Sequence, residues 1–246
     1  MAARFDQLFE NIEGVKLLYH KGKYDKVRAS DQNTVLRKWA VFLLNKFLGV
    51  DYATGRIIFW EDKPDMTNLI AGKKTVYIKT CSEINYKPSV FFYFKPIQSI
   101  EQKIKAIEKS YFEKTIGLHI RRTDSKLSIE LSPTSLFVDK INLELSENPE
   151  TYFFLATDDL DVQTQLTKIY SGRIIIYNKE FSRKTVGATQ DAVVDLFCLS
   201  KTSKIYGSFY SSFSKMAAKL SRSELEILKM PAIAKKGELV ETSTAV

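Results

Sequence analysis

The sequence predicts an α/β protein in which residues 111–229 form a doubly wound parallel sheet with helices on both faces. Four short apolar segments in this part are separated by segments whose apolar residues recur every three or four positions. No long loop interrupts the alternation. Strands that alternate with helices form parallel sheets, because each helix crosses over between neighbouring strands. About one hundred residues of this alternation is the size of one nucleotide-binding half of a doubly wound fold.

The elements of this part follow from their apolar patterns. The expected strands are apolar runs bounded by polar residues, and the expected helices have apolar residues on one side. In chain order they are a strand at Thr115–Ile120, a helix over 134–147, a strand at Tyr152–Ala156, a helix over 159–169, a strand at Arg173–Tyr177, a helix over 190–201, a strand at Lys204–Tyr206 and a helix over 212–221. Residues 230–246 lose the periodicity, so we expect a mobile tail there.

Residues 1–110 have a less regular pattern and predict a partial α/β domain. Helical spacing of apolar residues occurs in three segments, and four further apolar runs are short enough for strands. The expected helices are Phe5–Ile12, Thr34–Leu48 and Ile97–Glu108, and the expected strands are Val15–Tyr19, Ile57–Trp60, Thr75–Ile78 and Val90–Phe94.

The composition is that of an ordinary globular protein. Of the 246 residues, 44% are hydrophobic and 27% are charged, which excludes a disordered chain, a collagen-like chain and a small disulfide-stapled module. No apolar run approaches the roughly 18–20 residues that a membrane-spanning helix needs. The two cysteines, Cys81 and Cys198, are too few for a disulfide framework, and they favour a reducing, cytoplasmic location.

The net charge of +8 is concentrated in the first part of the chain. Residues 1–110 hold 19 Lys and Arg against 12 Asp and Glu, whereas residues 111–246 hold 18 against 17. A basic surface can meet an anionic membrane, a phosphorylated ligand or nucleic acid. An ordinary solubilising surface explains the surplus equally well. Aromatic and basic residues do not alternate as they do in RNA-binding motifs, so no nucleic-acid partner is expected.

Several catalytic signatures are absent from the sequence. No group of His, Cys, Asp and Glu residues has the spacing of a zinc site, so no metal ligand is expected. There is no glycine-rich dinucleotide fingerprint, no P-loop and no nucleophile elbow. Dinucleotide binding of the usual kind, ATP hydrolysis and serine hydrolysis therefore lack support.

Polar side chains follow each of the four strands, at the position where ligands bind in an open α/β sheet. Arg121 and Arg122 come directly after a buried apolar run. The planar guanidinium matches a phosphate group with two hydrogen bonds. The alternative, with equal weight, is that Arg121 pairs with a nearby acid such as Asp124 or Asp158. His119, in the same strand, is by itself most simply interpreted as a core residue.

The remaining candidates also have a structural interpretation. Asp158 and Asp159 follow the second strand, where acids often cap a helix. Ser211 and Ser212 open the last helix, whose N–H groups suit either N-capping or phosphate binding. Asp195 interrupts an apolar helical pattern, where an acid either faces solvent or holds a specific donor.

Three segments together resemble a known family. Ile116–Asp124, with the sequence IGLHIRRTD, is similar to the first motif of the superfamily of α1,2-, α1,6- and protein O-fucosyltransferases. Phe153–Asp159 resembles the second motif, and Asp191–Ser200 with Ile205–Ser214 resembles the third. The three segments occur in the expected order over residues 115–222, and the α1,6 branch of the family is the most similar.

The resemblance implies a GT-B glycosyltransferase that uses GDP-fucose as donor. Transfer to a glycan hydroxyl would proceed with inversion at the anomeric carbon and without a metal. In this family pattern, Arg121 matches the residue that binds the donor β-phosphate. His119 and Asp195 match positions near the guanine and the ribose, and Ser211 and Ser212 match the turn that contacts the diphosphate.

The other residues of the matching segments are carried over with less defined roles. Arg122, Asp158 and Asp159 are expected on the donor side, and Asp124 is the candidate general base. The implied partners are a GDP-sugar and a glycan or lipid-linked oligosaccharide acceptor, in polysaccharide biosynthesis. The basic first part of the chain also fits peripheral contact with a membrane surface.

One feature of the family is missing from residues 1–110. The family opens with a glycine-rich segment of the form GxGNR, which residues 1–110 do not contain. The resemblance therefore implies an incomplete acceptor-side domain over 1–110 and a Rossmann-like nucleotide-sugar domain over 111–229. The alternative function is a non-catalytic relative that binds a sugar nucleotide or a glycan without turnover.

Overall fold

A computed structural model gives the architecture of the chain. It describes residues 3–15, 39, 42, 43, 46, 52–53, 68, 71–77, 88–182 and 184–231. The chain divides into two compact units, one formed by Met1–Asn11 with Phe94–Val246 and the other by Ile12–Tyr93. The first of these units contains the sheet and the candidate site.

The central feature of the first unit is a parallel sheet of five strands, which confirms the predicted fold class. The strands are β3 (Thr115–Ile120), β4 (Tyr152–Thr157), β5 (Ile174–Ile176), β6 (Lys204–Ser208) and β7 (Glu224–Leu228). Their order in the sheet is β5-β4-β3-β6-β7. The chain moves from β3 outward to β4 and β5 and then returns to the other side of β3. The strand order therefore reverses between β3 and β6, where open α/β sheets bind ligands.

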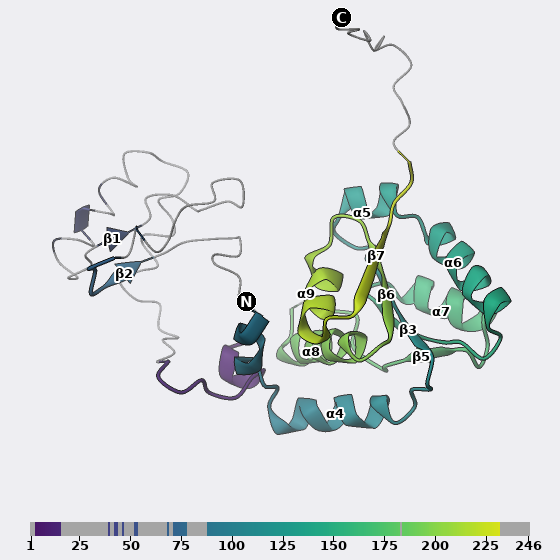
Figure 1. The fold of residues 1–246 in the computed structure, drawn as a ribbon, viewed down its shortest axis with the longest axis horizontal. Helices are drawn as coiled ribbons and strands as arrows, with labels where there is room; N and C mark the ends of the chain where they lie inside the picture. The colour runs from purple at the N-terminus through teal and green to yellow at the C-terminus, as the bar shows by residue number, and fades with distance from the viewer. Residues whose placement is uncertain are drawn as a thin grey trace, which may run out of the picture. The chain divides into compact units, whose positions relative to one another are not determined.

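Helices cover both faces of this sheet (Figure 1). The helices of this unit are α4 (Gln98–Glu108), α5 (Lys126–Leu131), α6 (Thr134–Glu147), α7 (Leu160–Ile169), α8 (Val186–Ser200) and α9 (Ser212–Ser221). Residues of α6 and α7 pack on one face of the sheet, and residues of α4, α8 and α9 pack on the other. The unit is therefore a three-layer α/β/α sandwich.

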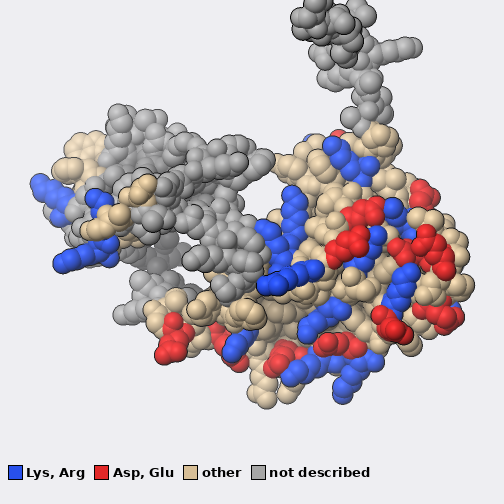
Figure 2. Space-filling model, in the orientation of Figure 1, with Lys and Arg blue, Asp and Glu red and all other residues tan. Residues whose placement is uncertain are grey.

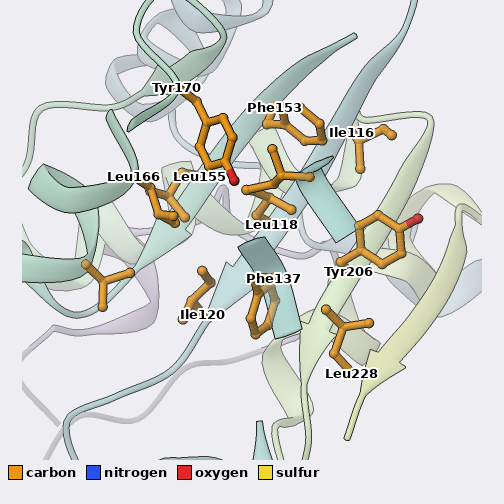
Figure 3. Close-up of a cluster of buried hydrophobic side chains, with 12 residues drawn as sticks. Ile116, Leu118, Ile120, Phe137, Phe153, Leu155, Leu166, Tyr170, Tyr206 and Leu228 are labelled. Atoms are coloured by element: carbon orange, nitrogen blue, oxygen red, sulfur yellow. The ribbon is translucent and has the colours of Figure 1, made fainter. Parts of the chain in front are cut away.

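The alternation of side chains along β3 explains how both faces become buried. Ile116, Leu118 and Ile120 point into the cluster formed with α6 and α7, as Figure 3 shows. Gly117 and His119 have the opposite orientation, because successive side chains of a strand alternate between faces. A Cβ atom at Gly117 would lie 2.6 Å from the Leu199 side chain of α8. This position therefore requires glycine for close packing of helix on strand.

The predicted elements of the sheet domain are found with small shifts in their bounds. The predictions for β3, α6 and α9 match the observed bounds, and β4, α7 and β6 differ by one or two residues. β5 is confined to Ile174–Ile176. Helix α8 begins four residues before the predicted position 190, because the side chain of Thr185 accepts a hydrogen bond from the Ala188 N–H at 3.0 Å. This cap extends the helix by one turn.

Two short elements of the sheet domain, α5 and β7, are absent from the sequence prediction. β7 is an edge strand in which Glu224 and Glu226 alternate with apolar residues. Both glutamates pair with Lys204 of β6, at 3.3 and 3.5 Å. The acidic residues make the segment resemble a polar linker in the sequence, because the lysine that pairs with them belongs to the neighbouring strand.

The N-terminal segment corrects a second prediction. A helix was expected at Phe5–Ile12, but only a 3-10 turn, η1 (Phe5–Gln7), forms there. Phe9 makes an antiparallel bridge with Pro96, and the N–H of Glu10 donates to the carbonyl of Lys95 at 2.8 Å. These tertiary hydrogen bonds replace those of a continuing helix.

Helix α4 confirms the prediction for Ile97–Glu108 and packs against α8 in the unit that contains the sheet. The Lys103 ammonium donates to Asp191 of α8 at 3.2 Å. The side-chain amide of Gln190 donates to the carbonyl of Gln7 at 2.9 Å. Residues 3–11 and α4 therefore pack against α8.

The second unit contains parts of several predicted elements. A short parallel pair joins β1 (Tyr52–Ala53) to β2 (Val76–Tyr77), the latter within the predicted strand Thr75–Ile78. In the predicted helix Thr34–Leu48, the four described residues, Trp39, Phe42, Leu43 and Lys46, are helical. The run Val90–Phe94, expected as a strand, lies largely in the 3-10 helix η2 (Pro88–Tyr93). The fixed φ of Pro88 suits the start of such a helix.

Several sequence predictions lie outside the described residues. These are the strand at Ile57–Trp60, nearly all of the strand at Val15–Tyr19, and the tail beyond residue 231. Within the part of the chain that the structure covers, no helix combines the length and apolar character that crossing a bilayer requires. On the visible face of the first unit, Lys and Arg lie among Asp and Glu (Figure 2), as the near balance of charges over 111–246 leads one to expect.

Candidate functional site

A pocket of about 460 Å³ opens at the carboxyl ends of β3 and β4. Its volume lies within the roughly 300–1,000 Å³ that is usual for small-ligand sites. Four of the candidates from the sequence line it, namely His119, Arg121, Asp158 and Asp195. The residues come from two strand ends and from α8. Parallel strands bring their carboxyl ends to one edge, which is why segments far apart in the sequence meet here.

Hydrogen bonds to the neighbouring strand β6 fix the backbone at Arg121, at the end of β3. The Ser208 hydroxyl of β6 donates to the carbonyl of His119 at 3.2 Å and accepts from the N–H of Arg121 at 3.1 Å. The guanidinium contacts Asp124 through two nitrogens, at 2.9 and 2.8 Å. The pairing foreseen as an alternative is therefore present, and Arg121 also lines the pocket. An ion pair this exposed contributes only about 0–1 kcal/mol, so an incoming anion can compete with it.

Arg122 has a different orientation from Arg121. Its guanidinium donates to the carbonyls of Arg121 and Ser132 at 2.9 and 2.6 Å and to the Thr134 hydroxyl at 3.2 Å. Burial lowers the pKa of this guanidinium, while Asp158 and Asp159 oppose the shift. The side chain is not among the residues that line the pocket. In this structure it joins the turn after β3 to the segment between α5 and α6.

Asp158 ties the two strand ends together. Its carboxylate accepts from the backbone N–H of Arg122 and from the hydroxyl of Thr123, both at 2.7 Å. Asp159 caps α7 by accepting from the Val162 N–H at 3.0 Å, as the capping interpretation predicts. The loop that carries Arg121 is thus held by the neighbouring strand.

The remaining candidates lie outside the pocket lining. Ser211 is the N-cap of α9 and accepts from the Phe213 N–H at 3.4 Å. Ser212 begins this helix, and Asp124 is occupied by Arg121 as described above. None of the three lines the pocket. Their proposed contacts with a diphosphate or an acceptor therefore stay predictions.

His119 combines burial with an unpartnered nitrogen. Its ring stacks on Phe213 of α9, with centroids 4.8 Å apart. Burial lowers the pKa of His119 to about 3, and the nearby Arg121 and Lys179 act in the same direction against Asp158. The ring is therefore neutral at physiological pH. Its Nδ1 atom is buried without a hydrogen-bond partner in the protein.

Asp195 is the second pocket residue with an unsatisfied buried atom. Its Oδ2 forms an ion pair with the Lys179 ammonium, and its Oδ1 has no protein partner. Burial raises the pKa of Asp195 to about 6; Lys179 opposes this shift, and Asp191 adds to it. Buried polar groups are nearly always hydrogen-bonded. The unpaired atoms of His119 and Asp195 therefore suit a ligand that supplies the missing partners.

Asp191, one turn earlier in α8, makes a useful contrast. The hydroxyl of Tyr177 donates to its Oδ1 at 2.6 Å, and the Lys103 ammonium donates to the same oxygen at 3.2 Å. The N–H of Glu180 donates to its Oδ2 at 3.4 Å. Both of its carboxylate oxygens are thus used within the protein. Asp191 holds the segment after β5 against α8, whereas Asp195 faces the pocket.

Sequence reasoning did not identify Lys179 or the aromatic walls Phe181 and Phe213. Lys179 follows β5 by three residues, in the region where polar strand-end residues were sought. The signal was therefore its position after a strand, but only the structure shows that it is buried and paired. Phe181 and Phe213 line the pocket beside Ala156, Ala188 and Ala192. These apolar residues leave room between the polar groups.

The part of the chain that the structure describes contains no candidate metal site. No group of three or more His, Cys, Asp and Glu residues there could hold a metal ion. The positive charges at the pocket come instead from Arg121 and Lys179.

Comparison with solved structures identifies proteins with the same fold. The chain is similar to NodZ, an α1,6-fucosyltransferase soaked with GDP-fucose, with a TM-score of 0.54 and 16% identity over 88% of this chain and 75% of that chain. A structure of NodZ co-crystallized with GDP gives a TM-score of 0.51 and 16% identity over 86% and 74% of the two chains. No protein-family model matches the chain, and no curated protein matches it in sequence.

A plant protein has the same fold. The chain is similar to a mutant of FUT1 from Arabidopsis thaliana in complex with GDP, with a TM-score of 0.59 and 15% identity over 93% of this chain. It spans 62% of the length of that FUT1 chain. At such identities the likeness concerns the fold. The chain has the fucosyltransferase-like α/β fold of GT-B type that the three sequence segments indicated.

Proposed function

We propose that this chain binds GDP-fucose in the pocket at the carboxyl edge of its sheet. The reaction is transfer of fucose, with inversion at the anomeric carbon, to a hydroxyl of a glycan or lipid-linked oligosaccharide. One observation carries the proposal: the pocket combines an arginine with two buried polar atoms that lack protein partners, in His119 and Asp195. The similarity in fold to structures that contain GDP or GDP-fucose supports the choice of donor.

Arg121 is the proposed phosphate ligand. A diphosphate offers more charge and more oxygen atoms than Asp124, so the guanidinium can exchange its exposed carboxylate partner for the donor. Breaking the bond between sugar and phosphate builds negative charge on the leaving diphosphate. A fixed guanidinium stabilises that charge and is the main catalytic contribution we assign to this chain. Because Arg121 supplies this positive charge, we propose that no divalent metal is needed.

The nucleobase is the proposed partner of Asp195 and His119. Guanine carries N–H donors on its edge, and the carboxylate Oδ1 of Asp195 is a buried acceptor. The rings of Phe181 and Phe213 provide apolar surface for a planar base. His119, neutral at physiological pH, can make one hydrogen bond through Nδ1 without adding charge.

The proposed acceptor side is formed by residues next to the pocket lining and by the basic first part of the chain. Asp124 is the proposed general base: the donor would displace its carboxylate from Arg121, and the carboxylate would then accept the proton of the attacking acceptor hydroxyl. Ser211 and Ser212, at the N-terminus of α9, are proposed to orient the diphosphate through the N–H groups of the first turn. The basic residues of 1–110 are proposed to face an anionic acceptor or membrane surface.

Calorimetric titration of the chain with GDP-fucose, GDP and UDP, in buffer containing EDTA, tests the proposal. The expected result is saturable binding of GDP-fucose and GDP that survives moderate salt, with weaker binding of UDP. Binding of none of the three would contradict it. Release of GDP from GDP-fucose in the presence of glycan acceptors then separates an enzyme from a relative that only binds the donor.

A further inference from the structure

The buried ion pair between Lys179 and Asp195 bears on which nucleobase the pocket accepts. We infer that Lys179 determines the selection of guanine over adenine, by donating a hydrogen bond to the carbonyl oxygen O6 of guanine while Asp195 accepts from N1–H. This inference rests on the proposed function. It assigns a role to a residue that neither the strand-end motifs nor the phosphate site uses.

Lys179 is buried to an unusual degree for a lysine. Its side chain is 8% exposed and that of Asp195 is 7% exposed. Lysine is almost never this buried unless it is paired, and a buried pair is often no more stabilising than apolar residues of similar volume. The ion pair therefore adds little to the stability of the fold beyond what apolar side chains of similar volume would provide. Its place in the pocket wall points to a role in binding.

The pair lies among the residues that line the pocket, and it leaves hydrogen-bonding capacity unused. Only Oδ2 of Asp195 is used by Lys179, and Oδ1 has no partner in the protein. A lysine ammonium has three donors and no acceptor. Its Nζ also lies 5.5 Å from the centroid of the Phe181 ring, another pocket residue. One donor group and one acceptor atom therefore lie side by side in the same wall.

This donor and acceptor match the edge of guanine and oppose that of adenine. Guanine presents the acceptor O6 next to the donor N1–H. Adenine presents the donor N6–H₂ next to the acceptor N1, so each of its groups would meet a group of the same kind. Leaving polar groups unpaired in a buried site is the strongest form of discrimination against a near-isosteric ligand. Uracil also places a carbonyl oxygen beside an N–H, so the pair discriminates between the purines and not against uracil.

A different role for Lys179 makes a different prediction. Lysine also binds phosphate as a point charge. A lysine that contacts the diphosphate would contribute equally to the binding of GDP and ADP, which share that group. The ratio of the two dissociation constants therefore distinguishes base selection from phosphate binding.

The test is calorimetric titration of the full chain with GDP, IDP and ADP, for the wild type and for Lys179→Met. Methionine keeps the volume of the side chain and removes its donors. The wild type should prefer GDP to ADP, and Lys179→Met should reduce the ratio at least tenfold, mainly by weakening GDP. IDP, whose base retains O6 and N1–H, should respond to the variant as GDP does.

Two further variants keep the test interpretable. Lys184→Met changes an exposed lysine of the same segment and should leave the ratio unchanged. Lys179→Met combined with Asp195→Asn removes both charges of the buried pair, so we expect it to fold even where the single variant does not, and it should also lose the preference. An unchanged ratio in Lys179→Met or in the double variant overturns the inference while leaving the proposed function intact. A wild type that does not bind GDP overturns both.

Discussion

The carboxylate of Asp158 accepts a hydrogen bond of 2.7 Å from the backbone N–H of Arg122 and so joins the end of β4 to the turn that follows β3. It accepts a second bond of the same length from the Thr123 hydroxyl. The loop that presents Arg121 to the pocket therefore depends on a residue of the neighbouring strand. The position of the proposed phosphate ligand is a property of the sheet as a whole.

Replacing Asp158 should loosen this loop. Asp158→Ala leaves the N–H of Arg122 without its partner, and we expect the free energy of unfolding to fall by about 1–3 kcal/mol. Urea denaturation measures this change. Asp161→Ala, at an exposed acid in the first turn of α7, is the matched control and should lower the free energy by less than about 1 kcal/mol. Equal effects of the two variants would show that Asp158 does not hold the loop.

The ionisation of Asp195 should appear in the pH dependence of donor binding. Burial places the pKa of this carboxyl at about 6, and only the ionised form offers both oxygens as acceptors. The affinity should therefore be complete about one unit above this pKa, be roughly halved at it, and fall by up to about tenfold per pH unit below it. GDP-fucose is the suitable ligand, because the terminal phosphate of GDP itself titrates near pH 6.

Several groups surround Asp195 besides its partner Lys179. Asp191 raises the pKa of Asp195. Tyr111 and Cys198 are neutral in this pH range, because burial raises their pKa values. The Asp195→Asn variant should bind more weakly and show no step near pH 6. A wild-type affinity that is constant from pH 5 to 8 would rule out a direct contact between the donor and the carboxylate.

The histidine in the pocket should not titrate near neutral pH. Burial lowers the pKa of His119 to about 3, so its ring resonances should be constant between pH 5 and 8. Because His20 is the only other histidine, a His20→Gln variant leaves a single imidazole signal to follow by NMR. A midpoint near the ordinary value of about 6.5 would show that the His119 ring is open to solvent.

Close packing of α9 on β6 should make Gly207 intolerant of a side chain. A Cβ atom there would lie 2.5 Å from Oγ and 2.7 Å from Cβ of Ser214. Gly207→Ala should therefore lower the free energy of unfolding by about 1–3 kcal/mol, the usual cost of overpacking. Gly187, in the first turn of α8, meets only Thr185 at 4.0 Å. Gly187→Ala should be neutral or stabilising by about 0.5–1 kcal/mol in the same denaturation experiment.

Much of the sheet domain could be predicted because its elements are locally determined. β3 and β4 are continuous apolar runs buried on both faces, and α6 and α9 have clear helical spacing. The edge strand β7 could not be recognised, because Glu224 and Glu226 are stabilised by lysines of other elements. The N-terminal segment was misjudged for a similar reason, since Phe9 pairs with Pro96, far away in the sequence.

The candidate site could be predicted where a residue follows a strand or interrupts an apolar pattern. That reasoning brought His119, Arg121, Asp158 and Asp195 to one edge, and the structure places all four at the pocket. It could not show that Arg122 turns toward Ser132, because two adjacent arginines have the same signature in a sequence. Lys179 was missed because a buried lysine has no local pattern. A cytoplasmic location and the domain bounds stay predictions.

The central claim is that Arg121 binds the diphosphate of the donor. Its most direct test is the affinity for GDP of Arg121→Ala, compared with Arg173→Ala. Arg173 pairs with Glu150 at the amino end of β5, opposite the pocket edge, and its replacement controls for the loss of a charge.

We predict that Arg121→Ala binds GDP roughly 10–100-fold more weakly than the wild type, the range expected for one charge-assisted contact. Arg121→Lys should not restore it, because lysine lacks the planar fork. Wild-type affinity in Arg121→Ala would contradict the account.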